Sequence, residues 1–97
     1  PPPGYVQWIH GETSDKNLGF ILNAPRIHPG NGFIVLLNCE NRTESFQVDL
    51  PAGNWRVIGD GKKIDMAGFA NYDTITGPRT LNIRVPNVRA LILMDGF

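Results

Sequence analysis

Residues 32–60 read GFIVLLNCENRTESFQVDLPAGNWRVIGD, and this stretch decides the fold. Its first part, Phe33–Cys39, is apolar on both faces of an extended chain. After a polar turn, Ser45–Leu50 alternates apolar and polar residues with a period of two, which is typical of a half-buried strand. Pro51–Gly53 is then expected to make a turn, so that Asn54–Ile58 runs back as a further strand. The stretch predicts three successive strands and contains no evident catalytic grouping.

The two-sided apolar pattern of Phe33–Cys39 recurs in Arg89–Met94 near the end of the chain. In a two-sheet sandwich, one face of each sheet would normally meet water. We therefore expect the outer face of these strands to pack on something beyond the 97 residues. Cys39 is the only cysteine, so no internal disulfide can form, and its place in an apolar strand predicts a small buried hydrophobic residue.

The remainder of the chain predicts further short strands. Eleven glycines and eight prolines interrupt it at short intervals, and no helical period of apolar residues is sustained. Seven to eight short strands in a Greek-key-like antiparallel β-sandwich are the expected all-β fold. Met66–Thr76 follows no clear pattern. The other expected strands are Tyr5–His10, Leu18–Asn23, an edge piece at Lys63–Asp65, Thr80–Pro86 with Leu81, Ile83 and Val85 inward, and Arg89–Met94.

Length and charge narrow the classes of function. Ninety-seven residues suit one domain. We expect residues 1–4, which read PPPG, to be the remnant of a linker, and residues 5–97 to form a single sandwich domain. Nine basic and nine acidic residues cancel, so there is no basic field for nucleic acid and no polybasic patch for a membrane surface.

Catalytic and metal-binding groupings are not recognisable in the sequence. The aspartates fall at expected strand edges or turns, where this residue supports Asx turns. His10 and His28 lack partners at ligand spacing, so no metal or cofactor is expected. Asn41-Arg42-Thr43 matches the N-glycosylation pattern, which has meaning only in a secreted eukaryotic protein. The aspartates in question are Asp49, Asp60, Asp65 and Asp73.

Aromatic side chains are the remaining candidates for ligand contact. Trp8 and Trp55 each share a strand face with a valine, which favours packing in the core. Tyr72, between Asn71 and Asp73, is the best candidate for an exposed carbohydrate contact, with Trp8 as the second.

Several of these strings resemble the C-terminal all-β domain of α-amylase-superfamily enzymes, and above all pullulanase-type debranching enzymes of glycoside hydrolase family 13. They are Ile34–Asn38, Leu50-Pro51-Ala52-Gly53 followed by Asn54–Val57, Ile83–Pro86, and Arg89–Leu93. The resemblance covers most of the chain from Tyr5, and Leu-Pro-x-Gly-x-Trp is its most specific string. Leu50, Pro51, Gly53 and Trp55 are accordingly expected to form a structural turn and part of the core.

The resemblance implies an accessory domain of an enzyme involved in starch degradation. In that family the catalytic residues lie on a barrel, so none can be carried over to this chain. The implied partner is the catalytic barrel of the same polypeptide, with α-glucan as a further ligand, and the implied location is secreted or periplasmic in a bacterium. Two alternatives stay open: a free-standing carbohydrate-binding module, and an immunoglobulin-like interaction domain.

Overall fold

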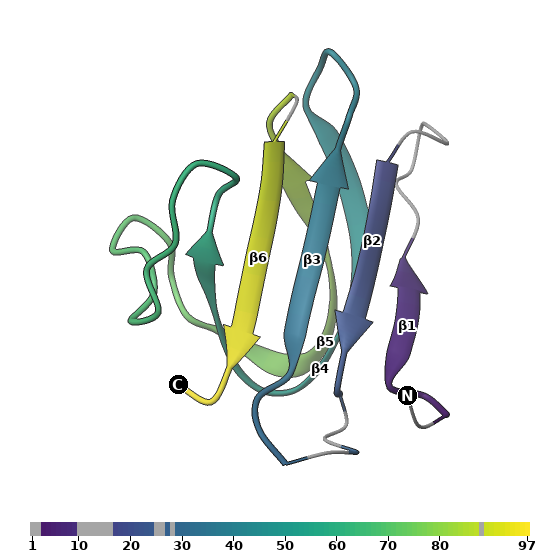
Figure 1. Cartoon of the computed structure of the whole chain (residues 1–97), viewed down its shortest axis with the longest axis vertical. Helices are drawn as coiled ribbons and strands as arrows, with labels where there is room; N and C mark the ends of the chain where they lie inside the picture. The colour runs from purple at the N-terminus through teal and green to yellow at the C-terminus, as the bar shows by residue number, and fades with distance from the viewer. Residues whose placement is uncertain (1–2, 10–16, 25–26, 28, 88) are drawn as a thin grey trace.

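The computed structural model describes residues 3–9, 17–24, 27, 29–87 and 89–97. These residues form antiparallel strands and no helix, which confirms the predicted all-β class (Figure 1). Consequently, none of the described residues belongs to a helix long and apolar enough to cross a membrane. The strands are β1 (Val6–Ile9), β2 (Asn17–Leu22), β3 (Phe33–Asn38), β4 (Glu44–Gly59), β5 (Ile75–Val85) and β6 (Arg89–Asp95).

All six strands belong to one sheet with the order β1-β2-β3-β6-β4-β5. In Figure 1 the strands β1, β2, β3 and β6 form a front layer, and β4 and β5 curl behind it. The sheet is thus a half-barrel whose two layers face each other across the core. β6, the last strand, lies between β3 and β4 and pairs with both, so the strand order differs from the Greek-key-like order that the sequence predicted.

β4 corrects the prediction of a turn at Pro51–Gly53. The chain does not run back there; it continues as one strand of sixteen residues. The register with β5 shifts between Leu50 and Gly53, which marks a β-bulge, and Gly53 has a φ of 131°. A bulge bends its strand and increases the local twist, so this one lets β4 pass from the rear layer to the front layer. Proline and glycine mark bulges as well as turns, which is why the sequence misled.

The described residues form six strands and not the seven or eight expected, mainly because the bulge joins two of the expected strands into one. The expected strands Ser45–Leu50 and Asn54–Ile58 are both parts of β4. The expected edge piece at Lys63–Asp65 is reduced to an isolated bridge between Gly59 and Ile64. The strand expected at Thr80–Pro86 begins earlier, at Ile75.

The core lies between the layers and confirms the alternation read in β4 and β5. Phe46, Val48 and Leu50 are buried, Val85 is buried, and Leu81 and Ile83 pack against the same cluster. Trp55 is fully buried at 0% exposure, as expected. The front layer supplies Ile9, Ile21, Ile34, Leu36, Leu91 and Leu93.

Cys39 corrects another expectation. β3 ends at Asn38, so Cys39 falls outside the strand and its thiol is exposed. Asn38 takes the last buried position of the strand instead. Along β3 the buried side chains are Ile34, Leu36 and Asn38, so position 39 falls on the opposite side of the alternation from the core. Because both sides of the strand are apolar, the pattern did not show which side is inside.

Candidate functional site

The front layer carries an apolar surface on the side that faces away from β4 and β5. We call this surface the outer face. Cross-strand partners in a sheet point to the same side, so the registers identify its members. They are Val6 and Trp8 on β1, Leu18, Phe20 and Leu22 on β2, Phe33, Val35 and Leu37 on β3, and Ala90, Ile92 and Met94 on β6.

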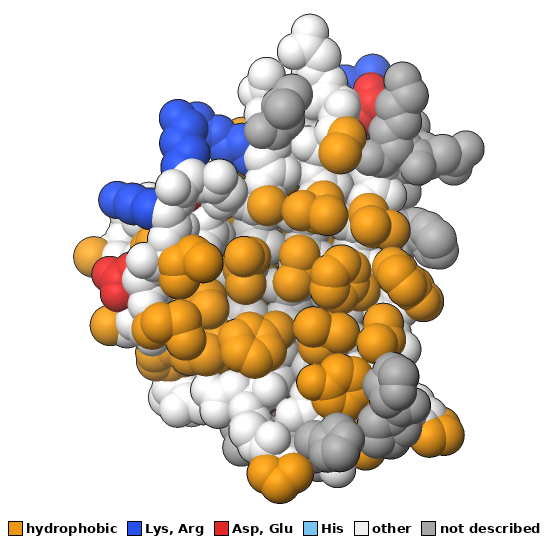
Figure 2. All heavy atoms as spheres, in the orientation of Figure 1, with side chains coloured by type: hydrophobic (Ala, Val, Ile, Leu, Met, Phe, Trp, Pro, Cys, Tyr) orange, Lys and Arg blue, Asp and Glu red, His pale blue; other side chains and the backbone are white. Residues whose placement is uncertain are grey.

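These side chains form rows across all four strands. One row is built by the pairings of Trp8 with Phe20, Phe20 with Val35, and Val35 with Ile92. The neighbouring row joins Val6, Leu22, Phe33 and Met94 in the same way. Figure 2 shows the result as a continuous hydrophobic band across the front of the molecule. The band follows from the apolar period-two pattern on every one of these strands.

The outer face is accessible in this chain. Trp8 is 61% exposed, with its ring edge-on to Phe20 at a centroid distance of 5.7 Å. Most of the other side chains of the outer face are half-buried. The outward side of the rear layer differs, since Gln47, Asp49, Thr80, Asn82 and Arg84 are exposed there. The rear layer therefore has the polar exterior of a free-standing domain, and the front layer does not.

The position of Trp8 corrects the expectation that it packs in the core. Trp8 and Ile9 are neighbours on β1 and so point to opposite sides, and it is Ile9 that faces the core. The alternation was identified correctly, but both sides of this strand carry an apolar residue, so the pattern alone could not say which side is inside.

The apolar surface continues beyond β6 onto the loop that follows β4. Ile64 is 65% exposed and Met66 is 57% exposed. A shallow hollow of about 220 Å³ lies between Ile64 and Ile92, and Lys62 and Lys63 also line it. The basic residues thus stand at the rim of the apolar surface and not inside it.

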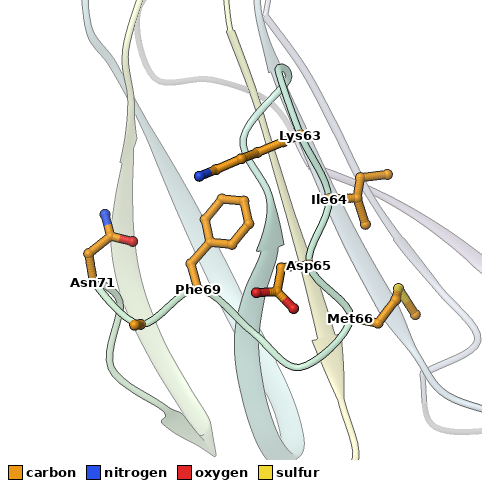
Figure 3. Close-up of a pocket in the computed structure, with 7 residues that line it drawn as sticks. Lys63, Ile64, Asp65, Met66, Phe69 and Asn71 are labelled. Carbon is orange, nitrogen blue, oxygen red and sulfur yellow. The ribbon is translucent and has the colours of Figure 1, made fainter.

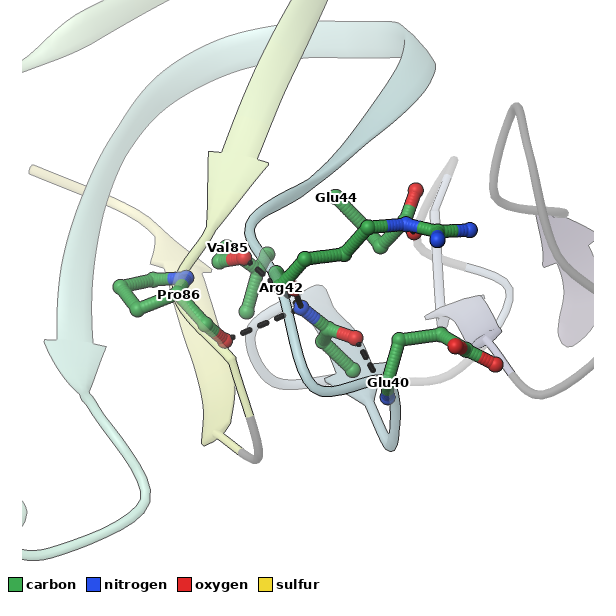
Figure 4. A network of polar contacts seen from close by, with 6 residues as sticks. Glu40, Arg42, Glu44, Val85 and Pro86 are labelled. Carbon is green, nitrogen blue, oxygen red and sulfur yellow. Dashed lines mark hydrogen bonds and ion pairs between the residues drawn. The ribbon is translucent and has the colours of Figure 1, made fainter.

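A polar network at one end of the half-barrel has a structural role (Figure 4). The Asn38 side-chain amide donates to the carbonyl oxygens of Arg42, Val85 and Pro86, and its oxygen accepts from the Glu40 backbone N–H. Arg42 Nε donates to the buried Glu44 carboxylate at 2.6 Å, which raises the pKa of Arg42. These contacts fasten the β3–β4 turn to the end of β5.

The four aspartates considered in the sequence lie on the exposed side of the sheet or in the loop that follows β4. Asp49 accepts from the Thr80 hydroxyl at 2.8 Å on the exposed side of the sheet. Asp60 and Asp65 accept backbone N–H groups in turns, as expected for this residue. Asp73 is exposed. Within the part of the chain that the structure describes, no three His, Cys, Asp or Glu side chains gather to hold a metal ion.

The other candidates are dispersed. His10 and His28 lie outside the described residues. Asn41 is exposed in the β3–β4 turn. Tyr72 is half-buried, packs against the core cluster, and has its ring centroid 6.3 Å from that of Phe69. The structure therefore separates the two aromatic candidates, with Trp8 on the outer face and Tyr72 beside the loop.

The sequence missed part of the outer face. It predicted the contributions of β3 and β6 from their two-sided patterns, but not those of β1 and β2. The available signal was the spacing of Val6 and Trp8, and of Leu18, Phe20 and Leu22, which are apolar residues on the side opposite Ile9 and Ile21.

The fold and this surface define a small all-β, half-barrel domain with one exposed apolar face. No family model matches the sequence, and no match to it was found among curated proteins. Among solved structures the chain is similar to pullulanase from Bacillus acidopullulyticus, with 24% sequence identity and a TM-score of 0.62. The similarity covers 94% of this chain and 10% of that pullulanase chain, and at this identity it establishes a shared fold.

Proposed function

We propose that this chain is a non-catalytic accessory domain of a larger α-glucan hydrolase of the pullulanase type. In this proposal its outer face packs on the catalytic barrel of the same polypeptide and stabilises the enzyme. The single observation that carries the proposal is the continuous apolar outer face on a domain whose other surface is polar.

The size and chemistry of the outer face suit a protein partner. Monomeric proteins rarely expose contiguous apolar patches beyond a few hundred Å², and larger patches mark interaction sites. Four strands spaced at about 4.8 Å span about 14 Å, which accommodates one or two helices of about 10 Å diameter. The outside of a (β/α)₈ barrel is a ring of helices, so it offers surfaces of this form.

The similarity in fold supports a place within a longer chain. The segment similar to this chain makes up 10% of the matched pullulanase. In a chain of that length, the other nine-tenths of the same polypeptide would be a permanent partner for the domain. Permanent interfaces are the more hydrophobic class, in agreement with a face whose members are nearly all aliphatic or aromatic.

Trp8 supports a second candidate function, that of a carbohydrate-binding module. An exposed indole beside Phe20 offers a stacking surface for a sugar ring. The rest of the outer face argues against this candidate, because its members carry no side-chain hydrogen-bonding group apart from the Trp8 indole N–H. A soluble sugar needs such groups to replace its bonds to water. The accessory-domain proposal is therefore preferred.

The proposal is tested in the parent polypeptide. Reading the coding sequence upstream of Pro1 should give several hundred residues in βα alternation. In that enzyme, Ile92→Lys should lower the melting temperature and expose the junction to limited proteolysis, because a charge would be buried at the interface. Gln47→Lys, on the outward side of the rear layer, is the matched control and should leave both properties unchanged.

Three results would contradict the proposal. The first is an upstream stop codon or a string of β modules, as expected for an immunoglobulin-like interaction protein. The second is an unchanged melting temperature for Ile92→Lys in the parent enzyme. The third is hydrolysis of pullulan by the purified 97-residue chain, abolished by changing one of its own carboxylates.

A further inference from the structure

The outer face is not flat, because the row of side chains nearest the β3–β4 turn ends in a small residue. In this row Leu18 pairs with Leu37, and Leu37 pairs with Ala90 on β6. The other two rows end on β6 in Ile92 and Met94. The alanine side chain stops at Cβ, so the surface is depressed at this corner.

The loop that follows β4 forms a wall beside this depression. Gly61 lies directly against Ala90, since a Cβ atom added to Gly61 would be 3.0 Å from the Ala90 backbone nitrogen and 3.7 Å from its Cβ. Gly61 also has a φ of 87°, a conformation that glycine adopts without strain. A glycine at this position therefore allows the loop to approach β6 closely.

Two shallow hollows adjoin where the loop meets β6. One is the hollow of about 220 Å³ described above, and the other has about 260 Å³. Gly61 lines both, so they are neighbouring parts of one groove, which we call the β6 groove. Its apolar side chains are half-buried or exposed, so a partner can reach them. They are Leu37, Cys39, Ile64, Ala90 and Ile92.

Lys62 supplies a positive charge at the rim of the β6 groove. The neighbouring Lys63 ammonium lies 5.5 Å from the Phe69 ring centroid. Figure 3 shows Lys63 turned toward that ring, with Ile64 and Met66 on the other side of the loop. Lys62 is exposed, and among the described residues its ammonium makes no ion pair and lies over no ring. Its charge is therefore available to an acidic group of a partner.

We propose that the β6 groove is the anchor point at which the domain docks on its barrel. One large apolar side chain of a barrel helix inserts over Ala90, and a carboxylate of the same helix pairs with Lys62. Residues three or four apart on a helix are neighbours, so one helix can supply both groups. This inference rests on the proposed docking of the outer face and adds the chemistry of the partner to it.

The two parts of the groove have different roles in this inference. Side chains that fill a desolvated pocket contribute most of the energy of an interface. A charge at the rim contributes more to register and specificity than to affinity. Filling the groove should therefore have a large effect on docking, and reversing the charge of Lys62 should have a smaller effect that depends on salt.

The first test fills the groove in the parent enzyme. Ala90→Leu should accelerate cleavage of the junction upstream of Pro1 by thermolysin about tenfold, because the groove no longer accepts the side chain of the partner. Asn82→Leu places the same side chain on the outward side of the rear layer and should leave the rate unchanged. In the isolated 97-residue chain, Ala90→Leu should not lower the melting temperature.

The second test reverses the charge at the rim. Lys62→Glu should accelerate the same cleavage about threefold at low ionic strength. The difference from the unmodified enzyme should disappear in about 1 M NaCl, where the screening length is about 3 Å. Arg84→Glu, on the exposed side of the rear layer, is the matched control and should have no effect. Lys62→Glu removes no packed side chain, so it remains informative if Ala90→Leu disturbs the fold.

Cys39 provides a third readout, because it lines the groove and is exposed in this chain. In the parent enzyme its thiol should react with Ellman's reagent at least about tenfold more slowly than in the isolated chain, and Cys39→Ser identifies its signal.

The inference is overturned if Cys39 reacts equally fast in both proteins. It is also overturned if Lys62→Glu, or a folded Ala90→Leu variant, is cleaved at the unmodified rate. In these cases faster cleavage of Ile92→Lys would leave the docking of the outer face intact. An unchanged rate for Ile92→Lys would overturn both proposals.

Discussion

The indole Nε1 of Trp55 donates a hydrogen bond of 2.9 Å to the carbonyl oxygen of Pro51, four residues earlier in the same strand. The bond spans the bulge at which β4 bends, and the ring itself is fully buried between the layers. One side chain thus fills the core and satisfies a carbonyl that the bulge takes out of the regular ladder. This relationship gives the Leu50-Pro51-Ala52-Gly53-Asn54-Trp55 string its structural meaning.

Replacing Trp55 with Phe should test the importance of this bond. Phenylalanine keeps a large apolar ring but has no donor, so the Pro51 carbonyl would lose its partner. We expect the free energy of unfolding to fall by about 1–3 kcal/mol in urea denaturation. Trp8→Phe, at an exposed aromatic, is the control and should change it by less than about 0.5 kcal/mol. Equal effects of the two changes would show that the bond contributes nothing specific.

Gly77 on β5 should tolerate no side chain. A Cβ atom there would collide with the Pro51 carbonyl oxygen and lie 3.1 Å from that of Leu50. Both are backbone atoms of the bulge and cannot move aside, so Gly77→Ala should destabilise the fold by about 1–3 kcal/mol in thermal or urea unfolding. Thr76→Ala removes only an exposed bond to Asn54 Oδ1 and serves as the neighbouring control. A Gly77→Ala protein as stable as this control would mean that β4 and β5 are farther apart at the bulge than described.

Cys39 should react with a thiol reagent in the folded protein. Its side chain is exposed just after the end of β3, so access does not require unfolding. With Ellman's reagent we expect one thiol to be labelled at a similar rate in native buffer and in urea. Cys39→Ser should abolish labelling without changing the melting temperature. Labelling that appears only after denaturation would place the thiol in the core.

Asp60 should make a small contribution to the loss of stability of the fold at acid pH. Backbone N–H groups of Lys62 and Lys63 donate to its Oδ1 at 2.9 and 3.1 Å, and these bonds lower the pKa of Asp60 below its ordinary value of 3.8. Since the folded state has the lower pKa, the stabilisation is complete above pH 3.8 and is lost as the pH falls through the folded value.

The matched variant is Asp60→Asn, which keeps a side-chain oxygen for the two bonds and removes the charge. Melting temperatures measured from neutral pH to well below pH 3.8 should fall less steeply for this variant than for the unmodified chain. Parallel curves for the two proteins would show that Asp60 titrates alike in the folded and unfolded states.

The sequence predicted those parts of the fold where one side of a strand is apolar and the other is polar. Phe46, Val48 and Leu50 lie inside and Gln47 and Asp49 outside, as their alternation required. The pattern works there because a strand with one apolar side has a single favourable orientation.

Prediction failed where a short stretch of sequence is compatible with two different local structures. Pro51 and Gly53 suit a turn or a bulge equally, and the choice depends on β6 as a second partner for β4, which comes more than thirty residues later in the chain. Trp8 and Ile9 are both apolar, so only the packing of the layers decides which side is buried. The outer face was anticipated only in part, because the two-sided apolar pattern was recognised on β3 and β6 but not on β1 and β2.

The bend in β4 also has a consequence for how the domain should come apart. One continuous strand belongs to both layers, because it pairs with β5 from Glu44 to Trp55 and with β6 from Trp55 to Gly59. Neither layer can therefore open fully without breaking the ladder of the other. We expect the amide protons on both sides of the bulge to exchange with solvent through the same global opening, so that the layers melt as a single cooperative unit.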